Sequence, residues 1–192
     1  MFSAVKFITV FATAVVLTGC AAQKPQKTVW TKASANNFAI QVEPKAKALK
    51  NFNLKTARLE KSQDEGGRDY KYTLRKPGKL ISYYYKALDP GYAFYEKPNL
   101  QRMVKNEPWF QQKNGKIVGK GTLSNAKGRY EFVRVALTES NCIFSAYTYG
   151  ITGNELSDEG NEIAAISYCD TTPGSANQDD LAELIASVTF GR

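Results

Sequence analysis

The chain has 192 residues and no histidine, and its 26 Lys and Arg residues outnumber its 18 Asp and Glu residues, which gives a net charge of +8. This length suits a single domain with a sizeable buried core. Because histidine is absent, the usual general base of Ser and Cys hydrolases and the commonest zinc ligand are both missing.

The N-terminus carries an apolar segment in the pattern of a signal peptide. Lys6 precedes an apolar run at residues 7–16. This run is too short to span a bilayer, since a spanning helix takes about 20 apolar residues, but it matches the core of a cleavable signal. The segment closes with the sequence LTGC at positions 17–20 rather than with an A-x-A site.

This closing sequence resembles the lipobox of bacterial lipoproteins, which signal peptidase II cleaves before the cysteine. The resemblance implies that residues 1–19 are removed and that Cys20 becomes the first residue, with a diacylglycerol on its sulfur. Two or more long acyl chains hold a protein stably at a membrane without a spanning helix. In this class of lipoprotein the residue after the cysteine influences sorting, and Ala21 implies an outer-membrane anchor that faces the periplasm.

A polar stretch follows the predicted lipidation site. Residues 20–37 are rich in Gln, Lys, Thr, Ala, Ser and Asn, and only Val29 and Trp30 offer large apolar side chains. This composition predicts a flexible tether that gives the domain reach away from the membrane. We expect one folded domain at residues 38–192, beginning with an alternating strand at residues 38–42.

The middle of the chain alternates in the manner of antiparallel strands. The pattern predicts, in order, a short helix at residues 44–52, a hairpin of strands at 53–61 and 68–75, a short aromatic strand at 92–95 and a helical turn or two at 100–105. Residues 79–88 fit either a strand or a short helix, because their apolar side chains also lie at helical spacing.

The C-terminal half has the clearest periodicity. We expect strands at residues 116–123, 128–138, 141–149 and 162–169 and an amphipathic helix at residues 178–188. The predicted fold class is α+β, an antiparallel β-sheet of about five to seven strands with the C-terminal helix packed on one face. The order of strands, turn and closing helix resembles the small domains of PsbP-like proteins, and we transfer no function from that resemblance.

Cys142 and Cys169 remain once Cys20 is assigned to the lipid. Two cysteines in an oxidising compartment predict one disulfide, whereas two cysteines without histidine make a poor zinc site. Pairing residues 141–149 with 162–169 as a hairpin places Cys142 opposite Cys169. The same register sets three further pairs opposite each other: Phe144 and Ser167, Ala146 and Ala165, and Thr148 and Ile163.

An aromatic and basic block is the candidate binding surface. It comprises Tyr83, Tyr84, Tyr85, Tyr92, Tyr95, Lys86, Lys97 and Arg102. Aromatic faces beside cations suit stacking on sugars or contact with a partner protein. The alternative interpretation is that these side chains pack a sheet face, since strands favour tyrosine in any case.

No motif predicts catalysis, a metal or a cofactor: there is no glycine-rich phosphate loop, and the acidic residues 154–162 lack calcium-loop spacing. We therefore expect a lipid-anchored envelope protein, non-catalytic, that binds a partner protein or an anionic envelope polymer. The predicted location in the cell envelope argues against nucleic acid as a binding partner. Three alternatives stay open: an enzyme acting on cell-wall glycans or peptides, an inhibitor or accessory subunit of an envelope complex, and a basic surface with no specific ligand.

Overall fold

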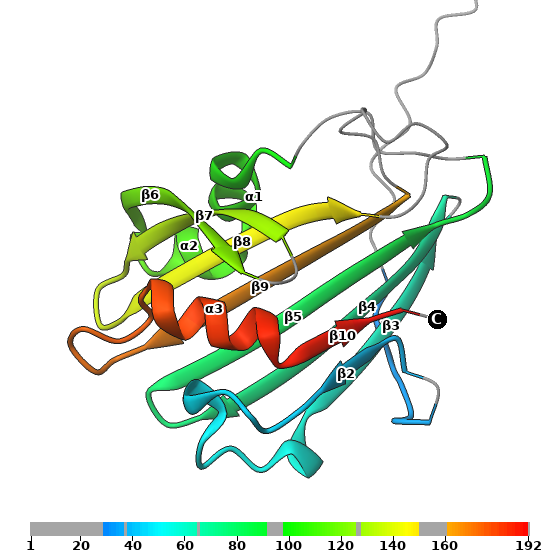
Figure 1. The fold of residues 1–192 in the computed structure, drawn as a ribbon, viewed down its shortest axis with the longest axis horizontal. Helices are drawn as coiled ribbons and strands as arrows, with labels where there is room; N and C mark the ends of the chain where they lie inside the picture. The colour runs from blue at the N-terminus through cyan, green and yellow to red at the C-terminus, as the bar shows by residue number, and fades with distance from the viewer. Residues whose placement is uncertain are drawn as a thin grey trace, which may run out of the picture.

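The computed structural model describes residues 29–36, 38–64, 66–91, 98–125, 128–149 and 161–191. Its main element is an eight-stranded sheet in the order β1-β3-β4-β5-β9-β8-β7-β6, in which every neighbouring pair is antiparallel (Figure 1). Its strands are β1 (Thr31–Lys32), β3 (Arg58–Asp64), β4 (Gly67–Lys76), β5 (Lys79–Leu88), β6 (Lys116–Asn125), β7 (Gly128–Ala136), β8 (Asn141–Tyr149) and β9 (Glu162–Asp170).

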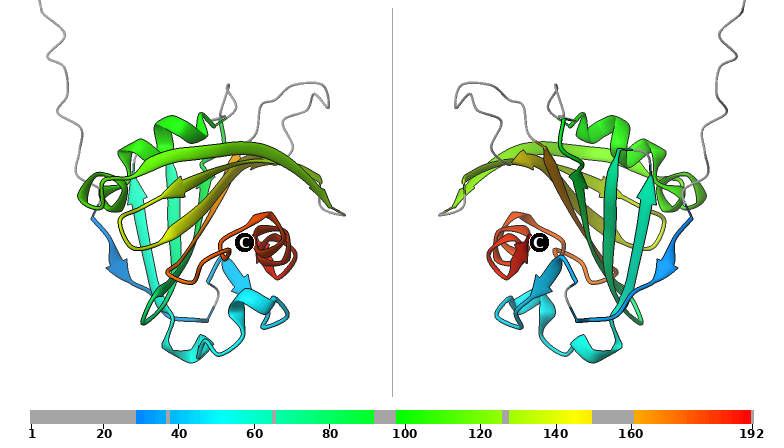
Figure 2. Two further views of the ribbon diagram at one scale, coloured as in Figure 1. Left: turned by 90° about the vertical axis from the view of Figure 1, so that its left-hand side faces the viewer. Right: turned by 90° about the vertical axis from the view of Figure 1, so that its right-hand side faces the viewer.

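The sheet is strongly curved, and other elements lie on both of its faces (Figure 2). The concave face holds α3 (Gln178–Ala186) and a second, two-stranded sheet of β2 (Ile40–Val42) and β10 (Val188–Phe190). The convex face carries α1 (Leu100–Asn106) and α2 (Pro108–Gln112). Two 3-10 turns, η1 (Lys47–Leu49) and η2 (Leu54–Thr56), lie at the far end of the molecule from α1 and α2.

Strict alternation along the central strands creates the concave core. On β5, Ile81, Tyr83 and Tyr85 are completely buried and meet Leu181 and Leu184 of α3 in one cluster. The intervening side chains of a strand point to the other face of the sheet. A single strand thus supplies both cores, and residues 79–88 form a strand rather than a helix.

The convex core is smaller and lies beneath α1 and α2. Leu100 and Val104 of α1 and Phe110 of α2 bury their side chains there against β7, β8 and β9. Val133, Val135, Leu137, Phe144 and Ala146 contribute to the same cluster, as the strand pattern predicts. Among the described residues, no helix has the length and apolar character needed to cross a membrane.

The predicted strand number is too low, because the sheet has eight strands rather than five to seven. One additional strand, β1, lies inside the segment expected to be a tether. Thr31 Oγ1 donates to the Lys61 carbonyl at 3.1 Å, and Ala33 N donates to the Leu59 carbonyl at 2.8 Å. The sheet therefore begins before residue 38, the predicted start of the folded domain.

The C-terminal helix is shorter than predicted. A capping box between Asn177 and Asp180 starts α3, and the helix ends at Ala186 rather than at residue 188. Ser187 Oγ donates to the Leu184 carbonyl at 2.9 Å and satisfies part of the last turn. Val188 then begins β10, because β2 offers a pairing edge to the chain as it leaves the helix. The predicted helix at 44–52 is likewise reduced to the turn η1.

Candidate functional site

The structure confirms the disulfide between Cys142 and Cys169, with a sulfur–sulfur distance of 2.07 Å. Its strands pair in the predicted register, including all three further pairs that the sequence pattern sets opposite each other. Both cysteines belong to the convex core, together with Leu100 and Val104 of α1. The bond therefore lies under the two helices and has no role in a metal site.

Two of the tyrosines predicted for the binding surface are core residues. Tyr83 and Tyr85 are 0 % exposed, so their assignment to a contact surface is wrong. Tyr85 stacks between Tyr70 and Phe190, with ring centroids 5.9 and 5.8 Å away. The alternative interpretation, that strand tyrosines pack a sheet face, describes both residues.

Tyr84 and Lys86 lie on the opposite face of β5 and converge on one carboxylate. The Tyr84 hydroxyl donates to Asp69 Oδ1, and Lys86 Nζ lies 3.5 Å from Asp69 Oδ2. Asp69 is only 4 % exposed, and both of its oxygens are engaged. This cluster satisfies a buried charge and ties β4 to β5, which is a structural role.

Of the remaining predicted residues, Tyr92, Tyr95 and Lys97 lie outside the described residues. Arg102 lies on α1 and is exposed. Asn99 caps this helix by accepting a hydrogen bond from Arg102 N at 3.0 Å. The predicted surface thus reduces, in the described part of the chain, to one exposed residue.

Arg102 is followed in the chain by further exposed cations that the aromatic block did not include. We call this set of residues the basic cap: Arg102, Lys105, Lys113, Lys116 and Lys120. All five side chains are exposed, and none is ion-paired with any described residue. Glu107 is the only carboxylate in the described stretch 98–125.

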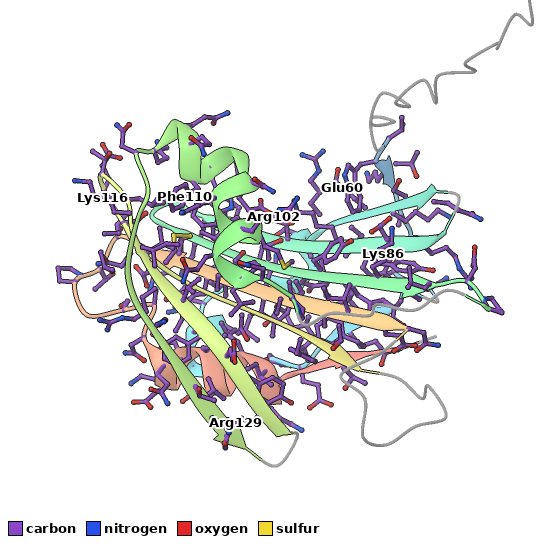
Figure 3. All side chains as sticks on the ribbon, turned by 90° about the horizontal axis from the view of Figure 1, so that it is seen from above. Glu60, Lys86, Arg102, Phe110, Lys116 and Arg129 are labelled. Carbon is purple, nitrogen blue, oxygen red and sulfur yellow. A yellow bond between two sulfur atoms is a disulfide. The ribbon has the colours of Figure 1, made fainter. Side chains whose placement is uncertain are left out.

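Helix packing directs these charges outward. Leu100 and Val104 occupy the buried side of α1, so Arg102 and Lys105 fall on its solvent side. Figure 3 looks onto this face of the molecule and shows Arg102 on it. Lys120 lies opposite Val133, a residue of the convex core, so its side chain belongs to the same face.

Two local features fix the turn that carries Lys113 and Lys116. Pro108 occupies the first turn of α2, where its missing N–H costs nothing. Gly115 passes so close to Phe110 that a Cβ atom would lie 2.5 Å from the ring, and only glycine fits there. The Phe110 side chain can therefore fill the convex core while the chain turns into β6.

A second buried ionic cluster lies at the other end of β5. Burial raises the pKa of the Asp170 carboxyl, but hydrogen bonds from Lys79, Tyr168 and Thr172 outweigh burial and hold that pKa well below its ordinary value. Burial and the nearby Asp170 charge raise the pKa of the Tyr168 hydroxyl. Every polar atom of Asp170 is engaged within the fold, so the cluster is an ion-pair network and presents no group to a substrate.

The described residues contain no group of three or more Cys, Asp and Glu side chains placed to hold a metal ion. One Ser-x-x-Lys spacing, Ser124 to Lys127, falls at the β6–β7 turn, and Lys127 lies outside the described residues. Ser124 is exposed on a strand rather than held on a helix, where residues three apart face each other.

Comparison of the chain with protein-family models, with curated proteins and with solved structures finds no match. Inference about function therefore depends on the site itself. The signal that the sequence interpretation missed is compositional: residues 99–120 combine five cations with a single acid and several exposed amides. This charge run was visible in the sequence, but the aromatic block drew the prediction away from it.

Proposed function

We propose that the protein is an envelope lipoprotein, attached through an acylated Cys20, whose domain binds a polyanionic component of the cell envelope through the basic cap. The protein acts by binding rather than by catalysis. The observation that carries this proposal is the group of five exposed cations, none of which is ion-paired with a described carboxylate.

Unpaired surface cations attract polyanions without a large desolvation penalty, because they remain in contact with water. Some cations are engaged within the fold: Lys79 pairs with Asp170, and Lys86 lies beside Asp69. The cap differs in how closely its exposed cations follow one another in the chain, with Glu107 as the one acid in the described stretch 98–125. Phosphate and carboxylate groups repeated along a polymer or a surface match several cations at once.

Binding is favoured over catalysis by the state of the buried acids. An enzyme acting on glycans needs a carboxyl group that can exchange a proton with its substrate. Asp69 and Asp170 are both buried and hydrogen-bonded within the fold. The oxygens of both carboxylates are engaged by groups of the fold itself.

The binding half of the proposal is tested with the purified lipoprotein and an anionic envelope polymer in solution. The cap variant combines Arg102→Gln, Lys105→Gln and Lys113→Gln. The control variant combines Lys47→Gln, Lys50→Gln and Lys55→Gln, which removes equal charge from exposed positions at the η1–η2 end of the molecule.

Wild-type affinity should fall steeply with salt, because polyanion binding releases counterions. The cap variant should lose about tenfold or more in affinity and show a shallower salt dependence. The control variant should keep wild-type affinity. Equal loss in both variants, or no binding by the wild type, contradicts the proposal.

The anchoring half is tested on the N-terminus. Mass spectrometry of protein extracted from membranes should find acylated Cys20 as the first residue. Cys20→Ser should prevent lipid attachment and leave either the precursor with residues 1–19 or a released form. An unblocked N-terminus without lipid in the wild type refutes the lipoprotein assignment.

A further inference from the structure

We infer that the basic cap rests on the anionic head groups of the same membrane that holds Cys20, so that lipid and charge attach the domain together. This inference rests on the proposed function, because it names the polyanion that the cap meets. Three features carry it: the point where the anchored end enters the fold, the length of chain before that point, and the positions of the two tryptophans.

The anchored end enters the fold on the face that carries the cap. Trp30 directly precedes β1, and Lys71 Nζ lies 6.0 Å from the centroid of its ring. Lys71 pairs in register with Tyr84, which packs against the convex core. Trp30 is therefore held over the convex face, as is Arg102 (Figure 3).

The chain before this point is short. Cys20 precedes Val29 by nine residues, and a fully extended chain spans at most about 3.3–3.6 Å per residue. The reach is thus at most about 30 Å, roughly half of what a tether of residues 20–37 would give. Reach towards a distant partner, which a long tether would favour, is correspondingly reduced.

This length limits how the domain can sit on the membrane. A compact domain of this size has a radius of gyration of about 15 Å and a diameter of about 40 Å. Nine residues span less than this diameter, so orientations that turn the anchored end away from the membrane are restricted. The anchor therefore favours orientations in which the convex face is turned towards the membrane.

Electrostatic attraction then favours direct contact between the cap and the lipid head groups. Exposed Lys and Arg residues near a membrane are attracted to anionic lipids within about one Debye length, some 8 Å at physiological salt. The cap offers Arg102, Lys105 and Lys120 on the face that the anchor already holds close. Glu107 alone opposes them in the described stretch 98–125.

Both tryptophans of the chain lie on this face. Trp30 is half-buried beside Lys71, and Trp109 is half-buried against the convex core. Tryptophan is enriched at the head-group level of membranes because its ring is apolar and its N–H is polar. The two residues therefore also serve as built-in probes of membrane contact.

The test uses the acylated full-length mature protein reconstituted into phosphatidylcholine vesicles, with or without phosphatidylglycerol, that contain brominated lipid as a tryptophan quencher. We expect quenching in the vesicles with phosphatidylglycerol at low salt, and loss of quenching at high salt. The docking equilibrium should fall by about fivefold for each cation that the cap variant removes. The control variant should dock as the wild type does.

Equal quenching in neutral vesicles, or an equal loss in the control variant, overturns the inference. Cap-dependent binding to a wall-derived polyanion without quenching on vesicles also overturns it and leaves the proposed function standing. If the protein binds neither the wall-derived polyanion nor anionic vesicles through the cap, both the proposed function and this inference are refuted. Should the cap variant melt at a lower temperature, the single changes Arg102→Gln and Lys113→Gln replace it, each with the smaller expected effect.

Discussion

Cys142 and Cys169 lie directly opposite each other on β8 and β9, and their bond joins two adjacent strands beneath α1. The two residues are 27 positions apart in the chain. The folded hairpin brings these two residues together whether or not they are bonded. In the unfolded chain the disulfide closes the same loop and removes conformational entropy. Its effect on stability falls mainly on the unfolded state.

Replacing both cysteines with alanine should lower the free energy of unfolding by roughly 3–4 kcal/mol, the loop-closure value for a separation of this length. Urea unfolding followed by far-UV circular dichroism measures the change. Dithiothreitol should destabilise the wild type by a similar amount and leave the double variant unaffected. An unchanged midpoint for the wild type in reductant would contradict this account.

The hairpin was predictable because its two strands carry the only two cysteines left after Cys20, and setting these opposite each other fixes the register. A one-residue slip would move every side chain to the other face of the sheet. The same logic predicted the hairpin of β3 and β4 from its glycine turn. The second hairpin is confirmed with different bounds, because the predicted strand at 53–61 contains η2 (Leu54–Thr56) and β3 runs over Arg58–Asp64.

Asp170 should make stability depend on pH. Its folded-state pKa is lowered, so acidification protonates the unfolded carboxyl first. The stabilisation is complete above the ordinary carboxyl pKa and is lost as the pH falls from about 5 towards the lower folded value. Asp170→Asn should therefore flatten the acid limb of the stability profile and cost about 1–3 kcal/mol at neutral pH.

Urea midpoints measured across the acid range test this prediction. Glu139→Gln is the matched control, because Glu139 is an exposed carboxylate in the turn before β8. It should keep the wild-type dependence on pH. An acid limb that is equally steep in wild type and Asp170→Asn would place the responsible carboxyl elsewhere.

Gly67 is the glycine, among those that the structure describes, where an added Cβ atom would come closest to backbone. A Cβ atom there would lie 2.3 Å from the Ala87 carbonyl oxygen, and this oxygen belongs to the backbone of a central strand. Gly67→Ala should cost about 3 kcal/mol, the upper end for overpacking. At Gly119 the nearest atom is Arg134 Nε at 3.2 Å, and that side chain is flexible and exposed, so Gly119→Ala should cost far less.

Thermal melting of the two glycine variants compares them directly. Equal melting temperatures would mean that the β4–β5 hairpin yields to admit a methyl group. The test is which variant has the lower melting temperature, and we expect this to be Gly67→Ala. Both variants introduce the same side chain into a strand, so the difference between them reports the local packing.

Other parts of the fold could not be predicted from local pattern. Thr31 and Lys32 carry no strand signal, and they pair only because β3 presents an open edge. Residues 79–88 fit two periods, and the choice is made by β4 and β9, which pair with this strand on both sides. The conformation of such segments is determined by strands that are distant in the chain. A local pattern in one sequence does not reveal which strands will pair.

The candidate site shows the same limit. Tyr83, Tyr84 and Tyr85 are consecutive, so a strand must send the middle side chain to the opposite face from the other two. The sequence reveals this alternation but not that both faces of the sheet are covered. Arg102, which was predicted only as part of the aromatic and basic block, is exposed, because helical spacing places it away from Leu100 and Val104.

Substitution of the tyrosines separates the sequence-predicted surface from the basic cap. Tyr85→Ala removes a fully buried ring and should cost about 3–5 kcal/mol. Tyr84→Phe removes the hydroxyl that donates to Asp69 and should cost about 1–3 kcal/mol. Neither change touches the cap, so each variant that stays folded should bind polyanion with wild-type affinity, whereas Arg102→Gln should bind more weakly at unchanged stability.

Binding is measured at a temperature where circular dichroism shows each variant folded, so that lost stability does not imitate lost affinity. Tyr84→Phe is the more informative of the two, because its hydroxyl lies on the convex face near the cap. If folded Tyr84→Phe protein lost affinity as Arg102→Gln does, the ligand would lie over β4 and β5. That result would contradict the assignment of binding to the cap. If both tyrosine variants keep wild-type affinity, the exposed cations remain the binding group. The tyrosines then contribute to stability through core packing and not to binding.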